Sequence, residues 1–354
     1  ICRGMLNTTL AKSGSGTISV RARWLSGCPV LLARTRGSWI EACGDILTTR
    51  ALGSPGQRNS RAADNAAPAL FDVLHQPVLP RNGEAVMVYA RARDPDGVSA
   101  CTLRYRVEGR AGTNAVAMVP AAGGYFAGEI PAGQPSSTIV AFFVEAADAC
   151  GQTARDRFPA GEPARECLVR YNEPLDSRAF GIYRFWMTKE NIAYWAAREK
   201  ASNQPVDATF LYGTNRVIYQ AGMQYAGSPF HSGYTTPINP GGNIDYEANF
   251  QNDDKLLDDD GVVLSTIGNL GSDTNGIREQ FCYSLAHAAK IPHMYRRYIH
   301  LYANGAEQNT KKIYEDTEKP NAGVLKHWFA EDAGRAFFKV DDWFEHTLAL
   351  SSFS

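Results

Sequence analysis

Two stretches of this chain carry residue types suited to holding a phosphate group. The first runs from Gly222 to Ser228 and includes Gly227, and its small residues would let the backbone approach a ligand closely. The second contains Arg278, whose planar guanidinium fork fits phosphate or carboxylate oxygens. Both stretches also have a structural interpretation, because the glycines could belong to an ordinary loop and Arg278 could pair with a neighbouring acid.

Paired aspartates are the other candidates for chemistry. Asp94 and Asp96 flank the proline of an Asp-Pro-Asp-Gly turn, and two carboxylates on a turn suit a calcium ion. A turn with solvated carboxylates is favoured, because the further oxygen ligands of a complete loop are missing. Asp341 and Asp342 could form a metal pair, but a structural or helix-starting role is favoured for them. We therefore assign no metal ligand.

The composition predicts a folded protein of two or three domains. The chain has 354 residues, of which 44% are hydrophobic and 21% are charged, so a packed core is expected. A net charge of −1 gives no reason to expect a nucleic acid or an anionic membrane as partner. No apolar run reaches the roughly 18 residues that a membrane-spanning helix needs.

The seven cysteines leave the redox state open. None of them shows the Cys-x-x-Cys spacing of a zinc site. Cys28 and Cys43 could form a disulfide, and so could two of Cys101, Cys150 and Cys167. Buried free thiols explain the same residues equally well, and the odd count leaves at least one cysteine unpaired.

The first half of the chain predicts β-structure. Residues 1–50 read as the C-terminal part of a β-domain, and residues 51–68 are a small, polar linker. Residues 69–172 predict a β-sandwich, with an alternating strand over 84–92 and the strongest β-run over 138–146. This segment is similar to the immunoglobulin-like or fibronectin-type modules attached to secreted bacterial proteins.

The second half adds helices to strands. Thr188 is a suitable N-cap for a helix that places Ile192, Trp195 and Ala196 on one face. A second helix is predicted over 277–290, with Phe281, Leu285 and Ala288 on its apolar face. Asn304-Gly305 then predicts the turn of a β-hairpin.

Three motifs in this half resemble the CotH kinase family, the atypical kinase-like proteins first known from bacterial spore coats. They are Gly-Ile-Tyr-Arg-Phe-Trp-Met-Thr-Lys (181–189), Ser-Asp-Thr-Asn-Gly-Ile-Arg-Glu-Gln (272–280) and Ile-Tyr-Glu-Asp-Thr-Glu-Lys-Pro (313–320). The resemblance implies that residues 176–345 form an α+β kinase-like N-lobe with its hinge region. It also implies ATP and Mg²⁺ as cofactors.

The resemblance assigns a nucleotide-binding role to six residues, with catalytic residues unknown: Gly222, Gly227, Ser228, Lys255, Arg278 and Glu315. Glu315 would lie near the hinge, or would be a solvated acid of a hairpin. Lys255 is the nearest candidate for the phosphate-neutralising lysine, although its acidic neighbours favour a solvated surface lysine. The sequence departs from the family at Pro229, which follows Ser228, and at Glu279, where the family has asparagine.

The expected function follows from this resemblance. We expect a C-terminally truncated fragment of a protein kinase that phosphorylates Ser or Thr of a coat or surface protein and is inactive without its C-lobe. The alternative is a non-catalytic, exported surface or adhesion protein with a degenerate kinase-like domain, whose β-domains contact a glycan or a protein. Either protein would be extracellular, cell-surface or spore-associated, although no signal peptide is visible.

Overall fold

A computed structural model divides the chain into two compact units, Ile1–Ala66 and Ala67–Ser354. In the first unit it describes the backbone of residues 6–10, 18–25, 28–35, 38–43 and 46–47. In the second it describes residues 67–95, 97–148, 155–160, 164–198, 202, 204–226, 236–267, 274–320 and 322–332.

The first unit contains a five-stranded antiparallel sheet in which each strand pairs with the next along the chain. Cys28 and Cys43 lie on its third and fourth strands, but their side chains are outside the described part, so the disulfide expectation for them is untested. The strands are β1 (Leu6–Leu10), β2 (Ile18–Leu25), β3 (Cys28–Thr35), β4 (Ser38–Cys43) and β5 (Ile46–Leu47).

The second unit begins with two packed sheets. One has the strand order β10-β11-β7-β6, and the other has the order β13-β12-β8-β9, with β14 also paired to β12. Alternation explains the core, since Val86, Val88 and Ala90 of one strand are fully buried. The strands are β6 (Ala69–Gln76), β7 (Val86–Arg93), β8 (Val98–Val107), β9 (Asn114–Ala117), β10 (Val119–Ala121), β11 (Tyr125–Ile130), β12 (Ile139–Asp148), β13 (Arg155–Phe158) and β14 (Cys167–Arg170).

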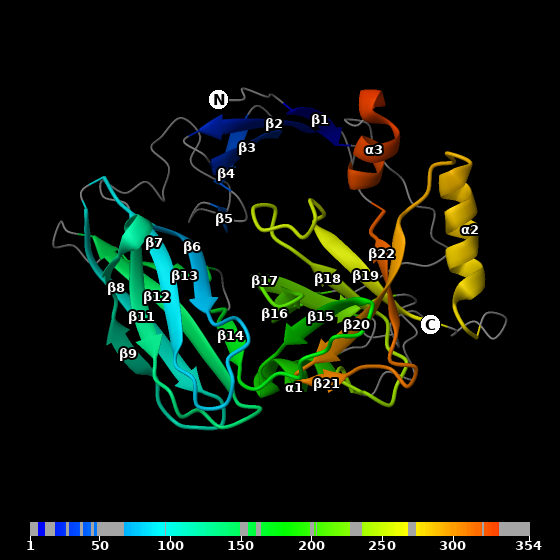
Figure 1. Cartoon of the computed structure of the whole chain (residues 1–354). Coiled ribbons are helices and arrows are strands. Elements are labelled where there is room, and N and C mark those ends of the chain that lie inside the picture. The colour runs from blue at the N-terminus through cyan, green and yellow to red at the C-terminus, as the bar shows by residue number, and fades with distance from the viewer. Residues whose placement is uncertain are drawn as a thin grey trace. The chain divides into compact units, whose positions relative to one another are not determined.

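The chain then forms a closed barrel of seven strands in the order β15-β16-β17-β18-β19-β22-β20 (Figure 1). The barrel closes because β15 pairs in parallel with β20, from Gly181 opposite Ile299 to Phe185 opposite Ala303. The strands are β15 (Gly181–Trp186), β16 (Val206–Tyr212), β17 (Arg216–Tyr225), β18 (Tyr246–Asn249), β19 (Gly261–Thr266), β20 (Arg296–Ala303), the short β21 (Ala306–Glu307) paired to β20, and β22 (Tyr314–Glu318).

The expected α+β kinase N-lobe is therefore wrong. Alternate residues of the seven strands, such as Tyr183, Phe185 and Tyr246, fill one common interior, so the strands form a closed barrel and not an open sheet packed against a helix. Among the described residues the α-helices are three, and none is long and apolar enough to cross a membrane. They are α1 (Lys189–Ala197), α2 (Ile277–Ala288) and α3 (Ala322–Trp328).

Helix α1 begins as its sequence predicts. The Thr188 hydroxyl accepts a hydrogen bond from the backbone N–H of Asn191 at 3.2 Å, which confirms the N-cap. Trp195 is buried in the barrel core and Ile192 packs against it, whereas Ala196 is exposed, so the expected apolar face is narrower than predicted.

The sandwich packs directly on the outside of the barrel. Ile139 and Leu168 of the sandwich form an apolar cluster with Trp186 and Leu211 of the barrel. This contact explains the unbroken apolar run at the start of β12, where one face fills the sandwich core and the other meets the barrel. Both sheets of the sandwich and the barrel thus share a buried apolar interface within the second unit.

Candidate functional site

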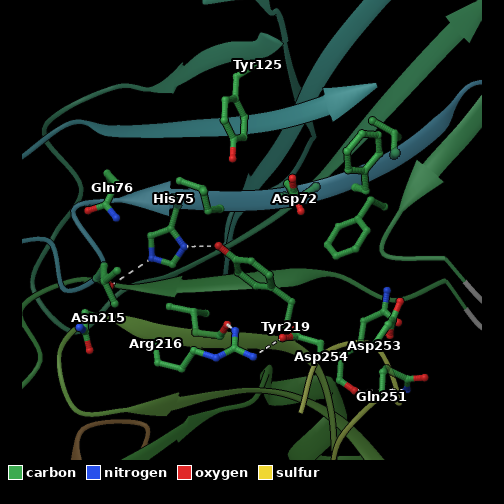
Figure 2. Close-up of a pocket in the computed structure, with 18 residues that line it drawn as sticks. Asp72, His75, Gln76, Tyr125, Asn215, Arg216, Tyr219, Gln251, Asp253 and Asp254 are labelled. Atoms are coloured by element: carbon green, nitrogen blue, oxygen red, sulfur yellow. Dashed lines mark hydrogen bonds and ion pairs between the residues drawn. The ribbon is translucent and has the colours of Figure 1, made fainter. Parts of the chain in front are cut away.

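A cavity of about 690 Å³ lies where strand β6 of the sandwich meets the barrel (Figure 2). One wall is β6 with Tyr125. The other is the start of β17 together with the loop that follows β18. Its polar lining side chains are Asp72, His75, Gln76, Tyr125, Asn215, Arg216, Tyr219, Gln220, Gln251, Asp253 and Asp254.

A β-bulge shapes the sandwich wall of this pocket. The pairing of β6 with β7 shifts register between Phe71 and Leu74, and Asp72 within the bulge has a positive φ of 50°. A bulge bends its strand and turns a side chain out of the regular alternation. The Asp72 carboxylate pairs with Arg91 at 3.1 Å, and the Arg91 guanidinium lies over the Tyr125 ring at 4.4 Å. Figure 2 shows the Tyr125 hydroxyl directed toward the pocket.

Arg216 holds the barrel wall in place. Its Nη2 bonds to the Asp254 carboxylate and, at 3.0 Å, to the backbone carbonyl of Lys255, while its Nη1 donates to the carbonyl of Val217 at 2.8 Å. Burial raises the pKa of Asp254, and the contact with Arg216 opposes that shift. The loop that carries Gln251 is therefore tied to the strand that carries Arg216.

His75 and Tyr219 meet between the two walls (Figure 2). Nε2 of His75 lies 3.1 Å from the carbonyl oxygen of Val78, which can only accept, so Nε2 carries the proton. Nδ1 therefore accepts from the Tyr219 hydroxyl at 2.6 Å. Burial lowers the pKa of His75 to about 4, so this imidazole is neutral at pH 7.

The pocket lining is thus about half polar and half apolar, and its charged side chains leave an excess of negative charge. Its lining carries three carboxylates and one guanidinium, and Arg91 pairs with Asp72 from just outside the lining, so one negative charge remains in excess. The amides of Gln76, Asn215 and Gln251 can both donate and accept hydrogen bonds. Such a lining can bind neutral or cationic groups rich in hydroxyls or amines, and it repels phosphates.

The residues expected to bind a nucleotide do not gather in this pocket. Gly222 lies within strand β17 opposite Asn249, and a Cβ added to it would come within 2.5 Å of the Pro205 side chain. Its small size therefore serves close packing of the strand rather than a phosphate-covering turn. Gly227 and Ser228 fall outside the described residues.

The other three expected residues have separate surroundings. Arg278 is exposed on the first turn of α2, and Lys255 contributes its backbone carbonyl to the Arg216 contacts. Glu315 is buried on β22, where it accepts hydrogen bonds from Arg296 and Gln280, each at 2.8 Å. No hydrogen bond or ion pair joins Gly222, Lys255, Arg278 or Glu315 to another member of this described set.

Sequence reasoning missed Arg296, which takes the structural role considered for Arg278. Nη1 of Arg296 lies 2.8 Å from both Glu279 of α2 and Glu315 of β22. It therefore ties the helix to the barrel. The sequence carries no local signal for this contact, because only the register of β20 and β22 places Arg296 beside the acid-rich segment around Glu315.

One group of described side chains has the composition of a metal site: Asp176, His300 and Glu307. The Arg178 guanidinium already contacts both carboxylates of this group. Nδ1 of His300 faces Glu307 at 3.3 Å and donates to the carbonyl of Lys312 at 2.7 Å, so this nitrogen carries a proton and cannot ligate a metal. We interpret the group as an ion-pair network around Arg178.

A second missed cluster joins three barrel strands. Arg297 of β20 and Tyr183 of β15 both bond to the Asp316 carboxylate of β22, and Arg297 also bonds to the Tyr183 hydroxyl. Asp316 is fully buried, and burial raises its pKa against the effect of Arg297. The cluster lies where β20 closes the barrel between the other two strands, which gives it a structural role.

Comparison of the chain with models of known protein families found no match. Comparison with curated proteins found no significant match either.

Proposed function

We propose that this chain is a non-catalytic binding module whose pocket between sandwich and barrel takes a saccharide or a similar polyhydroxylated ligand. The observation that carries the proposal is the lining of the 690 Å³ cavity, which combines carboxylates and amides with the Tyr125 hydroxyl. Carboxylate and amide oxygens accept from sugar hydroxyls, and amide nitrogens donate to them. A cavity of this size falls within the usual range for small-ligand sites.

The charge of the lining supports a neutral ligand over a nucleotide. Asp72, Asp253 and Asp254 outnumber Arg216, the single guanidinium of the lining. Arg216 is itself engaged by Asp254 and by two backbone carbonyls, so it is not available to pair with a phosphate. A triphosphate would therefore meet net repulsion here, whereas an uncharged sugar would not.

Transfer of phosphate from ATP to a protein hydroxyl stays a prediction from sequence resemblance alone. No residue was assigned to Mg²⁺. Four of the six residues assigned to the nucleotide lie in the described part of the chain, and Gly222, Lys255, Arg278 and Glu315 have separate surroundings there. Export to a cell or spore surface likewise stays a proposal, and it is compatible with glycan binding.

A panel of defined oligosaccharides, screened against the full chain, tests the proposed function. We expect at least one neutral oligosaccharide to bind and to be displaced by the same sugar free in solution. A correctly folded chain that binds no member of a broad panel would contradict the proposal.

A further inference from the structure

Helix α2 carries an apolar stripe that faces away from the protein. Ile277, Phe281 and Leu285 follow one another at four-residue spacing, which places them on one side of the helix. They are 62%, 61% and 53% exposed, and no residue of α2 is buried. The predicted apolar face therefore exists but is not used to pack α2 on the barrel.

The contacts that hold α2 to the barrel are polar and lie on other sides of the helix. Gln280 donates to Glu315 at 2.8 Å, and Glu279 pairs with Arg296 at 2.8 Å. The Arg296 guanidinium also lies over the Tyr283 ring at 4.4 Å. An amphipathic helix normally buries its apolar stripe. The exposed stripe of α2 is therefore a surface against which a further segment can pack.

The apolar surface continues beyond the helix and is flanked by charged residues, with the basic ones in excess. Ile291 and Phe329 are 56% and 45% exposed. Trp328, next to Phe329, donates from its indole N–H to the carbonyl of His293 at 2.7 Å, which fixes α3 beside the chain that leaves α2. The exposed Lys, Arg and Glu side chains of this part of the chain are the basic Arg278, Lys290 and Lys326 and the acidic Glu279 and Glu331, which leaves one positive charge in excess. We call the three stripe residues together with Ile291 and Phe329 the α2 face.

We propose that residues 336–350 of this same chain cover the α2 face. This segment lies outside the described residues, and its sequence is Ala-Phe-Phe-Lys-Val-Asp-Asp-Trp-Phe-Glu-His-Thr-Leu-Ala-Leu. It combines large apolar side chains, such as Trp343 and Phe344, with the acids Asp341, Asp342 and Glu345. With Lys339 counted, the three acids leave the segment two negative charges in excess, which complements the positive excess of the surface.

The covalent connection of residues 336–350 to α3 favours this segment over a separate partner as the cover of the α2 face. The described chain ends with the 3₁₀ turn Ala330–Asp332, directly after the residue that binds His293 near the end of α2. A segment that starts a few residues later is held at a high effective concentration beside the helix. The 12 residues of α2 span roughly 18 Å, a distance that this segment can follow. A second copy is disfavoured, because two α2 faces would bring like positive charges together.

The reaction rate of Cys282 with a bulky maleimide tests the proposal in the full chain. Cys282 is an exposed free thiol one residue from Phe281. We expect Phe344→Asp to raise its labelling rate at least about fivefold, a factor that corresponds to losing roughly 1 kcal/mol of docking energy. Ile277→Asp, which alters the face instead of the segment, should give a similar rise. Leu175→Asp, at a 68% exposed residue in the segment between β14 and β15, is the matched control and should leave the rate unchanged.

Reversing charges on the α2 face and on the segment provides a second test of the proposal. Lys290→Glu should speed labelling of Cys282, and adding Asp342→Lys to that variant should restore part of the protection. An unchanged rate in Phe344→Asp would overturn the proposal. Protection that depends on protein concentration and is indifferent to Phe344→Asp would assign the face to a second copy, which also overturns it.

Discussion

The hydroxyl of Tyr219, on barrel strand β17, donates a hydrogen bond to Nδ1 of His75, on sandwich strand β6, across 2.6 Å. Tyr219 belongs by its contacts to the sandwich core, where it packs against Phe142 with ring centroids 5.7 Å apart. A barrel residue therefore completes the core of the neighbouring domain. Because both residues also line the pocket, the shape of the proposed binding site depends on the contact between His75 and Tyr219.

The stability of the second unit should fall between pH 6.5 and pH 4 because of His75. Its pKa is about 4 in the folded protein, below the ordinary value of 6.5, so the unfolded chain binds the proton first. The contribution of neutral His75 to the free energy of unfolding is complete above pH 6.5. It is lost as the pH falls toward 4, to a total of about 3 kcal/mol. Urea unfolding at a series of pH values measures it.

A His75→Gln variant isolates this effect from the other titrating groups. Asp207 acts in the opposite direction, because burial raises its pKa to about 6. The difference between the two proteins should therefore shrink as the pH falls. A difference in unfolding free energy that stays constant from pH 7 to pH 4 would show that His75 is not buried in neutral form.

Loss of Glu173 should be far more destabilising than loss of an exposed acid. Glu173 pairs with Arg170 at 2.7 Å and accepts from the Trp186 indole at 2.9 Å. Arg184, fully buried, lies 3.6 Å from its other oxygen. Glu173→Ala would leave a buried guanidinium without its carboxylate, at a cost of about 3–5 kcal/mol.

Glu145→Ala is the matched control for this comparison. Glu145 pairs with Arg104 at 2.5 Å, but the Arg104 side chain is 36% exposed. Its loss should lower the free energy of unfolding by about 1 kcal/mol or less. Equal losses in the two variants, measured by denaturant unfolding, would rule out a special role for the buried pair.

Gly305→Ala should destabilise the protein more than Gly83→Ala. Both glycines have positive φ, 80° and 82°, so alanine strains either backbone by about 1 kcal/mol. A Cβ at Gly305 would also overlap the guanidinium of Arg170, whereas one at Gly83 meets nothing within 4 Å. We expect an additional loss of about 2 kcal/mol at Gly305. Similar thermal shifts for both variants would argue against the close approach of Arg170.

Local features of the fold were readable from the sequence. The alternation over residues 84–92 corresponds to strand β7, the apolar β-run over 138–146 corresponds to β12, and Thr188 caps α1. Asn304 and Gly305 both adopt positive φ between β20 and β21, as a tight hairpin turn requires. These features depend on neighbouring residues, which a sequence displays directly.

The pairing of strands that are distant along the chain could not be predicted from the sequence. The parallel contact of β15 with β20 closes the barrel, and nothing within Gly181–Trp186 shows which strand will lie beside it. His75 and Tyr219 are separated by 144 positions, so the pocket had no local signal apart from its polar residue types. Glu315 looked available for a ligand because its partner, Arg296, is identified only by the register of β20 and β22.

The most direct test of the central claim is a calorimetric titration of the full chain with the best-binding oligosaccharide and, separately, with ATP and Mg²⁺. We predict sugar binding that weakens about 5- to 30-fold in Tyr125→Phe, which loses the hydroxyl directed into the pocket. Tyr194→Phe, at a 54% exposed tyrosine of α1, should bind as the unaltered chain does, and ATP should not compete with the sugar. Sugar binding that is indifferent to Tyr125→Phe, or ATP binding that this substitution abolishes, would contradict the account.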